Sequence, residues 1–325
     1  MADRLAQAPP PTSGPTEPVG WIDGRELARQ RILPLRRPGR WLATAVVLVV
    51  SAQMINGLVT NPFYQWDRFG YWFLRPVVLD GLLVTLEVTA WTAVLGLAGG
   101  ILLALGRLSG SPIVSAVSWA YIWLFRSVPL IVVLLFLYNF SALYPELSLG
   151  VPFGPAFVTV EQSSLATAFV LAVVGLTLNE AAYAAEVVRA GILSVDQGQH
   201  EAAAALGLPR VYRLRRIVFP QAFRAIIPNY VNQLIGLIKG TSLVFYVSLL
   251  DLFGTVQSMG STHSGDIVPL LMVATVWYVI LTSVVSVAQF YVERHFSRGA
   301  LRSMPPTPLQ RLRHGLRRRA VRVAS

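Results

Sequence analysis

The sequence predicts an all-α polytopic membrane protein with about six transmembrane helices, and three observations lead to this fold class. Of the 325 residues, 54% are hydrophobic and only 13% are charged, and the charged share is about half the roughly 25% of soluble proteins. Several apolar runs approach about 20 residues, the length that crosses about 30 Å of hydrocarbon as a helix. The net charge of +11 gathers at the chain ends and in the predicted inner loops, where basic residues are retained.

Residues 1–40 are predicted to be a disordered, basic N-terminal segment, because they are rich in Pro, Ala, Gly and charge. Basic residues next to the first apolar run are Arg25, Arg29, Arg31, Arg36, Arg37 and Arg40. They predict that the N-terminus stays in the cytoplasm. The apolar run starts near position 41, too deep for an ordinary signal peptide.

Residues 41–79 are predicted to form an accessory transmembrane helix, residues 41–59, followed by an outer aromatic segment. Aromatic rings with polar edges favour the headgroup layer of a bilayer. We therefore expect the aromatic segment to lie at the outer interface, and an aromatic ligand cage is the alternative.

The second span is expected over residues 80–108. Gly96 and Gly100 have the GxxxG spacing that lets helices approach closely in lipid. Glu87 lies within the same apolar run, and a carboxylate there is costly unless it is paired, protonated or hydrated. Glu87 is therefore a candidate for lining a translocation path.

The next apolar segment is predicted to bend at Pro129, with an interfacial helix over residues 113–124 and a span over 128–143. Arg126 would lie near the inner interface, as an anchor or as part of the path or of a subunit contact. An outer loop of residues 144–164 follows and is longer than a plain connection needs, so an external partner could dock there.

Residues 165–189 form the next predicted span. Asn179 and Tyr183 share one face of it, and Glu186 can pair with Arg189 three residues later. Glu180 lies deeper in the span with no obvious local cation. It either lines a hydrated path with Asn179 or makes a hydrogen bond between packed helices.

After the inner loop, residues 226–238 re-enter the membrane and the helix is expected to break at Lys239 and Gly240. Interrupted backbone at membrane depth must be covered by protein or line a cavity. The break places Lys239, Thr241 and Ser242 near the centre, although Lys239 could instead snorkel outward. An outer turn, a final span over 267–291 and a basic cytoplasmic tail, residues 294–325, complete the chain.

The loop between these spans combines a short helix with a strongly basic segment. Gly207 stands where a helix would close at positive φ, and Pro209 discourages continuation. Arginines follow at positions 210, 213, 215 and 216, so the loop is expected on the cytoplasmic side. A short helix held between two spans could transmit force from a soluble partner.

The same loop resembles that of permease subunits in binding-protein-dependent ABC importers. The residues that match are Glu201, Ala202, Ala203, Gly207, Ile217 and Pro220. The family usually has Leu where Phe219 stands, and often an acidic residue in place of Gly240. Residues 126–130, 181–192, 220–224 and 239–243 are similar to the polar amino-acid branch, and the resemblance covers residues 80–293.

The resemblance implies a type I permease core over residues 80–293 with one extra N-terminal helix. It implies a subunit that moves a polar amino acid or similar small polar solute across the bacterial cytoplasmic membrane by ATP-driven alternating access. The implied partners are a cytoplasmic ABC ATPase dimer that receives the loop, an extracytoplasmic substrate-binding protein, and a second permease, identical or different. Both termini would be cytoplasmic.

Several activities are disfavoured by what the sequence lacks. It contains no phosphate-binding G-x-x-x-x-G-K-[ST] loop, no cysteine, no Ser-His-Asp set and only scattered histidines. We therefore expect no enzyme activity, cofactor or metal in this chain, and energy supplied by a separate ATPase. The arginines indicate anionic lipid rather than nucleic acid. An ion-coupled secondary transporter, using Glu87 and Glu180, and a membrane scaffold or sensor remain the alternatives.

Overall fold

The structure is a computed structural model that describes residues 38–144, 146–151, 155–161 and 167–296. Most of the predicted basic N-terminal segment and most of the predicted basic tail lie outside the described residues. The chain divides into two compact units, residues 1–61 and 62–325. In the first unit, α2 (Pro38–Thr60) is an apolar helix of 23 residues, long enough to cross a bilayer.

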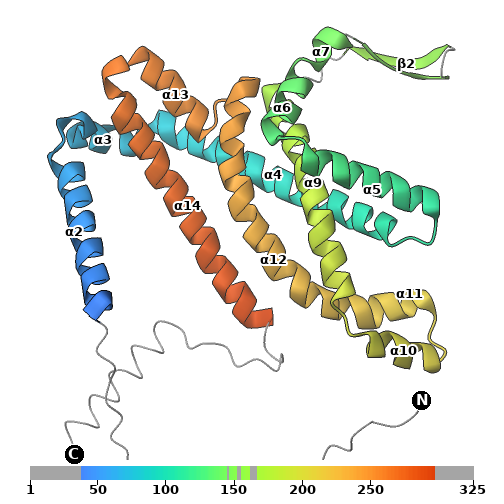
Figure 1. The fold of residues 1–325 in the computed structure, drawn as a ribbon. Helices are drawn as coiled ribbons and strands as arrows, with labels where there is room; N and C mark the ends of the chain where they lie inside the picture. The colour runs from blue at the N-terminus through green and yellow to red at the C-terminus, as the bar shows by residue number, and fades with distance from the viewer. Residues whose placement is uncertain (1–37, 145, 152–154, 162–166, 297–325) are drawn as a thin grey trace, which may run out of the picture. The chain divides into compact units, whose positions relative to one another are not determined.

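The second unit is built from helices, and Figure 1 shows their arrangement. Its long helices are α4 (Pro76–Arg107), α9 (Ala168–Leu193), α12 (Phe219–Gly240) and α14 (Ile267–Phe296). The shorter ones are α3 (Trp66–Phe73), α5 (Pro112–Ser127), α6 (Leu130–Tyr138), α7 (Phe140–Leu143), α10 (Gln197–Ala205), α11 (Arg210–Arg213) and α13 (Leu252–Thr262). Irregular helical turns are η1 (Pro62–Tyr64), the π-helical η2 (Leu214–Val218), η3 (Thr241–Val247) and η4 (Ser264–Asp266).

Four described helices are long and apolar enough to cross a membrane, and the number rises to six if two bent pairs each count as one span. One pair joins α5 to α6 with a bend of 100°, at the position of Pro129. The bend confirms the prediction made from that proline, which caps α6. The other pair joins the α12 region to α13 with a bend of 47°. The structure therefore agrees with the predicted all-helical membrane fold of about six spans.

The chain stops being α-helical after Gly240, where η3 continues as a 3-10 helix to Val247. This agrees with the predicted interruption near Lys239 and Gly240. The predicted outer loop, in contrast, contains an antiparallel hairpin of β1 (Glu146–Gly150) and β2 (Ala156–Glu161). In register, Leu147 pairs with Val160 and Leu149 with Val158.

The most extensive helix contact in the second unit is between α4 and α9. A Cβ atom on Gly96 would lie 2.6 Å from the Glu180 Cγ atom, and one on Gly100 would lie 2.5 Å from the Ala184 Cβ atom. The GxxxG pair therefore forms a groove that receives the small-residue face of α9, as the spacing predicts for helix packing. This close approach fixes the position of Glu180.

The aromatic segment packs against α14. The Phe73 and Trp277 rings are stacked with centroids 5.0 Å apart, and the Trp277 indole donates to the Phe73 carbonyl at 3.1 Å. Asp266 accepts from Arg68 and from the Trp72 indole, each at 2.9 Å. These bonds hold α3 against the start of α14. The predicted domain boundary at residue 79 stays a prediction.

Candidate functional site

Two regions of the second unit carry the predicted functional residues. The first is the inner segment, residues 194–220, which connects the end of α9 to the start of α12. Figure 1 shows its helices α10 and α11 at the end of α9 and α12 that lies away from α13. Asp196 caps α10 by accepting from the Gly198 N–H at 2.8 Å, which satisfies one of the free donors of the first turn.

The end of α10 has the closing geometry that the sequence predicted. Gly207 has φ +67°, a conformation that glycine adopts without steric cost. The Leu208 N–H donates to the Ala203 carbonyl at 3.1 Å, and the Gly207 N–H donates to the Ala204 carbonyl at 2.9 Å. These two bonds form a Schellman motif, so α10 ends sharply and the chain turns into the basic part of the segment.

The six residues of the predicted ATPase-contacting loop are arranged as follows. Glu201 and Ala202 are exposed, and the Glu201 carboxylate accepts from the Gln197 amide at 3.1 Å. Ala203 is buried with 2% exposure. The other three are Gly207, which is exposed, Ile217 in η2, which is half-buried, and Pro220 in the first turn of α12, which is exposed. The exposed Glu201–Ala202 edge is free to meet a partner, whereas Ala203 supports α10.

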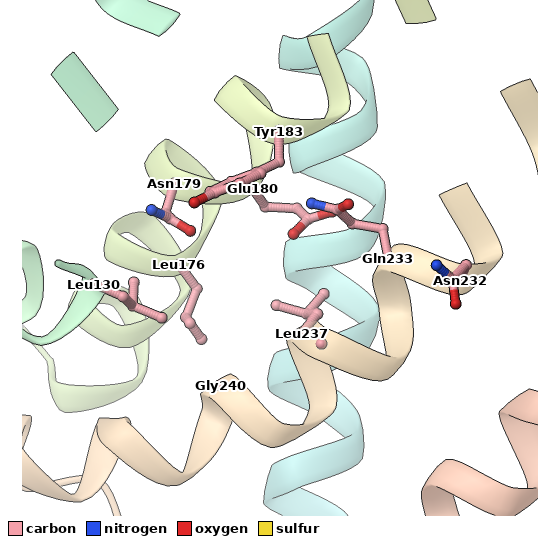
Figure 2. A pocket seen from close by; sticks show the side chains of 10 residues that line it. Leu130, Leu176, Asn179, Glu180, Tyr183, Asn232, Gln233, Leu237 and Gly240 are labelled. Atoms are coloured by element: carbon pink, nitrogen blue, oxygen red, sulfur yellow. The ribbon is translucent and has the colours of Figure 1, made fainter. Parts of the chain in front are cut away.

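The second region is a cavity of about 360 Å³ between α9 and α12 (Figure 2). It is lined by Leu130, Leu176, Asn179, Glu180, Tyr183, Asn232, Gln233, Gly236, Leu237 and Gly240. Three amides, one phenol and one carboxylate thus line a space between membrane helices. Such polar groups are expensive at membrane depth, and they mark paths and binding sites for polar solutes.

Glu180 is the most constrained of these groups. Its residue exposure is only 4%, because α9 presses it against the groove at Gly96. Gln233 of α12 interacts with its carboxyl group, and Figure 2 shows the two side chains pointing toward each other. The Glu180 Oε1 atom has no hydrogen-bond partner among the described residues. This oxygen is itself buried, so a donor in the cavity would reach it only after the surrounding side chains shift, and the unfilled acceptor would favour such a bond.

Only two of the six predicted path residues, Asn179 and Glu180, line this cavity. Glu87 is exposed on α4 and Lys239 is exposed at the end of α12. The Thr241 hydroxyl donates to the Ile238 carbonyl and the Ser242 hydroxyl to the Lys239 carbonyl, both at 2.8 Å. These two hydroxyl groups stabilise the turn into η3.

The sequence reasoning missed Asn232 and Gln233, and placed Tyr183 on the face of Asn179 without assigning it to the path. The adjacent amide pair within the mostly apolar stretch 230–238 was the available signal. Asn179 is held in place because its amide donates to the Phe125 carbonyl at 2.9 Å. Glu186 and Arg189 form the predicted ion pair at 2.8 Å. Arg126 lies over the Tyr183 ring, 5.4 Å from its centroid.

Within the described residues, no group of three or more His, Cys, Asp or Glu side chains could hold a metal ion. The cavity instead brings a carboxyl group together with amide groups, a set that can bind a polar solute bearing a positively charged donor. The inner segment offers an exposed helix edge.

The family model for the inner membrane component of binding-protein-dependent transport systems matches residues 96–298. The chain belongs to this family. It is therefore a multi-pass permease of the inner membrane, in agreement with its apolar helices. The match includes all the residues of both candidate regions.

Two relatives illustrate the similarity of this permease to characterised transport systems. It is 40% identical over 282 residues to the arginine transport system permease protein ArgU of Corynebacterium glutamicum, covering 86% of this chain and 87% of the relative. It is 36% identical over 220 residues to the glutamate/aspartate import permease protein GltK of Escherichia coli, covering 68% of this chain and 94% of the relative.

Two solved structures have the same fold. An amino acid ABC transporter crystallised with histidines has a TM-score of 0.58 and 30% identity, covering 68% of this permease and 94% of that chain. The inward-facing MetNI methionine ABC transporter has a TM-score of 0.50 and 23% identity, covering 70% and 97%, and that match shows the fold alone.

Proposed function

We propose that this permease moves a polar amino acid across the cytoplasmic membrane of a bacterium by ATP-driven alternating access. ATP would be bound and hydrolysed by a separate cytoplasmic ABC ATPase dimer. The relatives support this proposal, because ArgU and GltK are named for arginine and for glutamate and aspartate transport. Ion-coupled transport and a scaffold or sensor role are not favoured by these relatives.

The observation that carries the proposal is the Glu180 carboxyl group at the cavity between α9 and α12, whose buried Oε1 atom has no partner among the described residues. An amino acid carries an ammonium group that can donate to this oxygen, and amide groups nearby can bind its carboxylate. A charge-assisted hydrogen bond of this kind is shorter and stronger than a neutral one. Asn179 and Glu180 would therefore contact the solute, and Gln233 would hold the carboxyl group in position.

The cavity is completed by a second permease subunit in this proposal. Asn229, Asn232 and Lys239 are exposed on α12, and they follow one another at spacings of three and seven residues. Polar side chains on a transmembrane helix face protein or water rather than lipid. A second copy, or a related permease, placed along this stripe would enclose a hydrated path between the two subunits.

The inner segment would transmit the force. Glu201 and Ala202 would contact the ATPase dimer, while Ala203, Gly207, Ile217 and Pro220 would keep α10 rigid between α9 and α12. This places α10 and both termini in the cytoplasm, where basic flanks are retained. An extracytoplasmic substrate-binding protein would deliver the solute at the opposite end, near the β-hairpin. The core would span residues 80–293, with residues 41–79 as an accessory region.

The test is uptake of a radiolabelled amino acid by the complex of permease, ATPase and binding protein in vesicles, with competition from a panel of amino acids. Uptake that requires ATP is expected. Uptake driven by an ion gradient without ATP would contradict the proposal and favour a secondary transporter.

A paired variant tests the inner segment. Glu201→Arg with Gly207→Val should leave insertion intact and abolish ATP-dependent uptake, because the contact edge is reversed in charge and the φ of +67° is strained for valine. Gln199→Arg is the matched control on an exposed position of α10, and it should retain uptake. Full uptake by the double variant would reject this role for α10.

A further inference from the structure

A second cavity lies between α4, α9 and α12, close to the start of α12. It measures about 150 Å³ and is lined by Leu97, Ile101, Val188, Phe219, Phe223, Ile226, Ile227, Tyr230 and Val231. The Phe219 and Phe223 rings are stacked along one side, with centroids 5.9 Å apart. Phe223 is 43% exposed, so the cavity opens to the surface beside this ring.

The chemistry of this cavity differs from that of the central one. Tyr230 carries the only polar side chain among its lining residues, and its hydroxyl group donates to the Ala93 carbonyl at 2.6 Å. The donor of this hydroxyl group is therefore used within the chain, and the other lining side chains carry no polar group. An apolar cavity without polar partners stays dry or binds an apolar ligand. In a membrane, the abundant apolar ligand is a lipid acyl chain.

Two arginines precede the lining residues of this cavity in the chain. Arg215 and Arg216 are in η2, four and three residues before Phe219, and η2 leads directly into α12. Both are exposed, and neither guanidinium group has an ion pair or hydrogen bond with any residue that the structure describes. The chain therefore changes from unpaired positive charge to aromatic and aliphatic side chains within four residues.

We propose that the cavity and these arginines bind one anionic phospholipid of the inner leaflet. One acyl chain occupies the cavity against Phe219 and Phe223, and the headgroup phosphate accepts from Arg215 and Arg216. Guanidinium groups match phosphate oxygens in both charge and geometry. The arginines come three to four residues before the first aromatic ring, about the length of one helical turn. A phospholipid likewise has its charged phosphate at one end and its acyl chains at the other.

The site would link the lipid to the moving part of the permease. The cavity is formed by α4, α9 and α12, and η2 with its two arginines continues directly from the inner segment that carries α10. A bound lipid would hold the start of α12 against α4 and α9 while α10 moves. The inference rests on the proposed orientation, with α10 in the cytoplasm, and on no assumption about the solute.

The test uses the complex of permease and ATPase in nanodiscs of phosphatidylcholine, with a small fraction of photoreactive phosphatidylglycerol that carries a diazirine on one acyl chain. After illumination, cross-linked peptides are located by mass spectrometry. Cross-links are expected on residues 219–231 and 97–101. Photoreactive phosphatidylcholine should label the same peptides about tenfold less, because two arginines each attract anionic lipid.

Charge and shape are then varied separately. Arg215→Gln with Arg216→Gln should reduce phosphatidylglycerol labelling about tenfold, whereas Arg294→Gln, in the last turn of α14 and outside the lining of this cavity, should leave it unchanged. Ile101→Phe should fill the cavity and reduce labelling by either lipid. Leu102→Phe, at a position 71% exposed, is the matched control and should not.

Three results would overturn the proposal: equal labelling by both lipids, an Arg294→Gln effect as large as that of the double variant, or labelling on other helices only. A cross-link between two permease copies through Phe223→Cys, in a chain with no other cysteine, would show that a second subunit covers the cavity instead. Uptake by the wild-type permease is also measured in vesicles made of the same lipids. Normal uptake without the expected labelling would reject the lipid site and leave the proposed transport function intact.

Discussion

Two buried carboxylates in this permease have opposite surroundings. Asp251 has 0% exposure, and it accepts from the Gly254 N–H at 2.8 Å, the Tyr278 hydroxyl at 3.1 Å and the Thr85 hydroxyl at 3.4 Å. Glu180 has 4% exposure, and its Oε1 atom has no partner among the described residues. Asp251 therefore caps α13 and joins it to α4 and α14, whereas Glu180 keeps acceptor capacity for a ligand.

The comparison teaches that burial alone does not identify a transport residue. Both carboxylates are costly to bury, and the cost of Asp251 is offset by bonds within the chain. The cost of burying the Glu180 carboxylate is offset only in part, by Gln233. A solute or water must supply the remaining hydrogen bond. A buried carboxylate whose oxygen atoms all accept hydrogen bonds from the chain has a structural role. A buried carboxylate with an oxygen that accepts none can bind a ligand.

The largest effect on stability is expected at Asp251. Asp251→Ala removes the α13 cap and the shared acceptor of the Tyr278 and Thr85 hydroxyl groups, which should lower the free energy of unfolding by about 2–4 kcal/mol. Thermal unfolding of the detergent-purified permease measures this loss. An unchanged melting temperature would mean that Asp251 is not the structural member of the pair.

Gly96→Ala should have the next largest effect, because its Cβ atom would lie 2.6 Å from the Glu180 Cγ atom. Overpacking of this kind costs about 1–3 kcal/mol, and relief requires that Glu180 move in the cavity. We expect lower thermal stability together with a raised KM for uptake. Gly99→Ala is the control, because its Cβ atom would contact only the Ala181 Cβ atom at 3.1 Å. Equal effects of the two substitutions would argue against the groove.

Glu180→Gln should change transport more than stability. The glutamine keeps the shape of the side chain and loses the charge, so the ammonium of the solute loses a charge-assisted bond. A rise in KM of about tenfold or more is expected, since hydrogen bonds to charged groups contribute about 1.5–3 kcal/mol. Uptake kinetics and thermal unfolding are measured on the same preparation. A large loss of stability with an unchanged KM would assign Glu180 a packing role.

Glu87→Gln should have the smallest effect. This carboxylate is exposed on α4 and does not line the central cavity, so glutamine, which keeps its shape, removes no contact with the lining of that cavity. Uptake and melting temperature should match those of the unchanged permease. A tenfold loss of uptake would place Glu87 on the path, and would show that a second subunit brings it there.

Much of the fold could be predicted because it depends on local sequence. Apolar runs set the helices, Pro129 set the bend before α6, and the spacing of Gly96 and Gly100 predicted close packing. Gly207 predicted the positive φ at the end of α10. Residues within a few positions of one another determine each of these features, so no knowledge of distant contacts is needed.

The site could be predicted only in part, because its members come from separate helices. The sequence determined that Glu87, Glu180 and Lys239 lie in or beside apolar segments, and that a basic segment follows α10. Tertiary structure decided that Gln233 meets Glu180, that Glu87 is left at the surface, and that Thr85 and Tyr278 reach Asp251. The physical reason is that helical periodicity fixes which residues share a face, while the packing of distant helices fixes what that face meets.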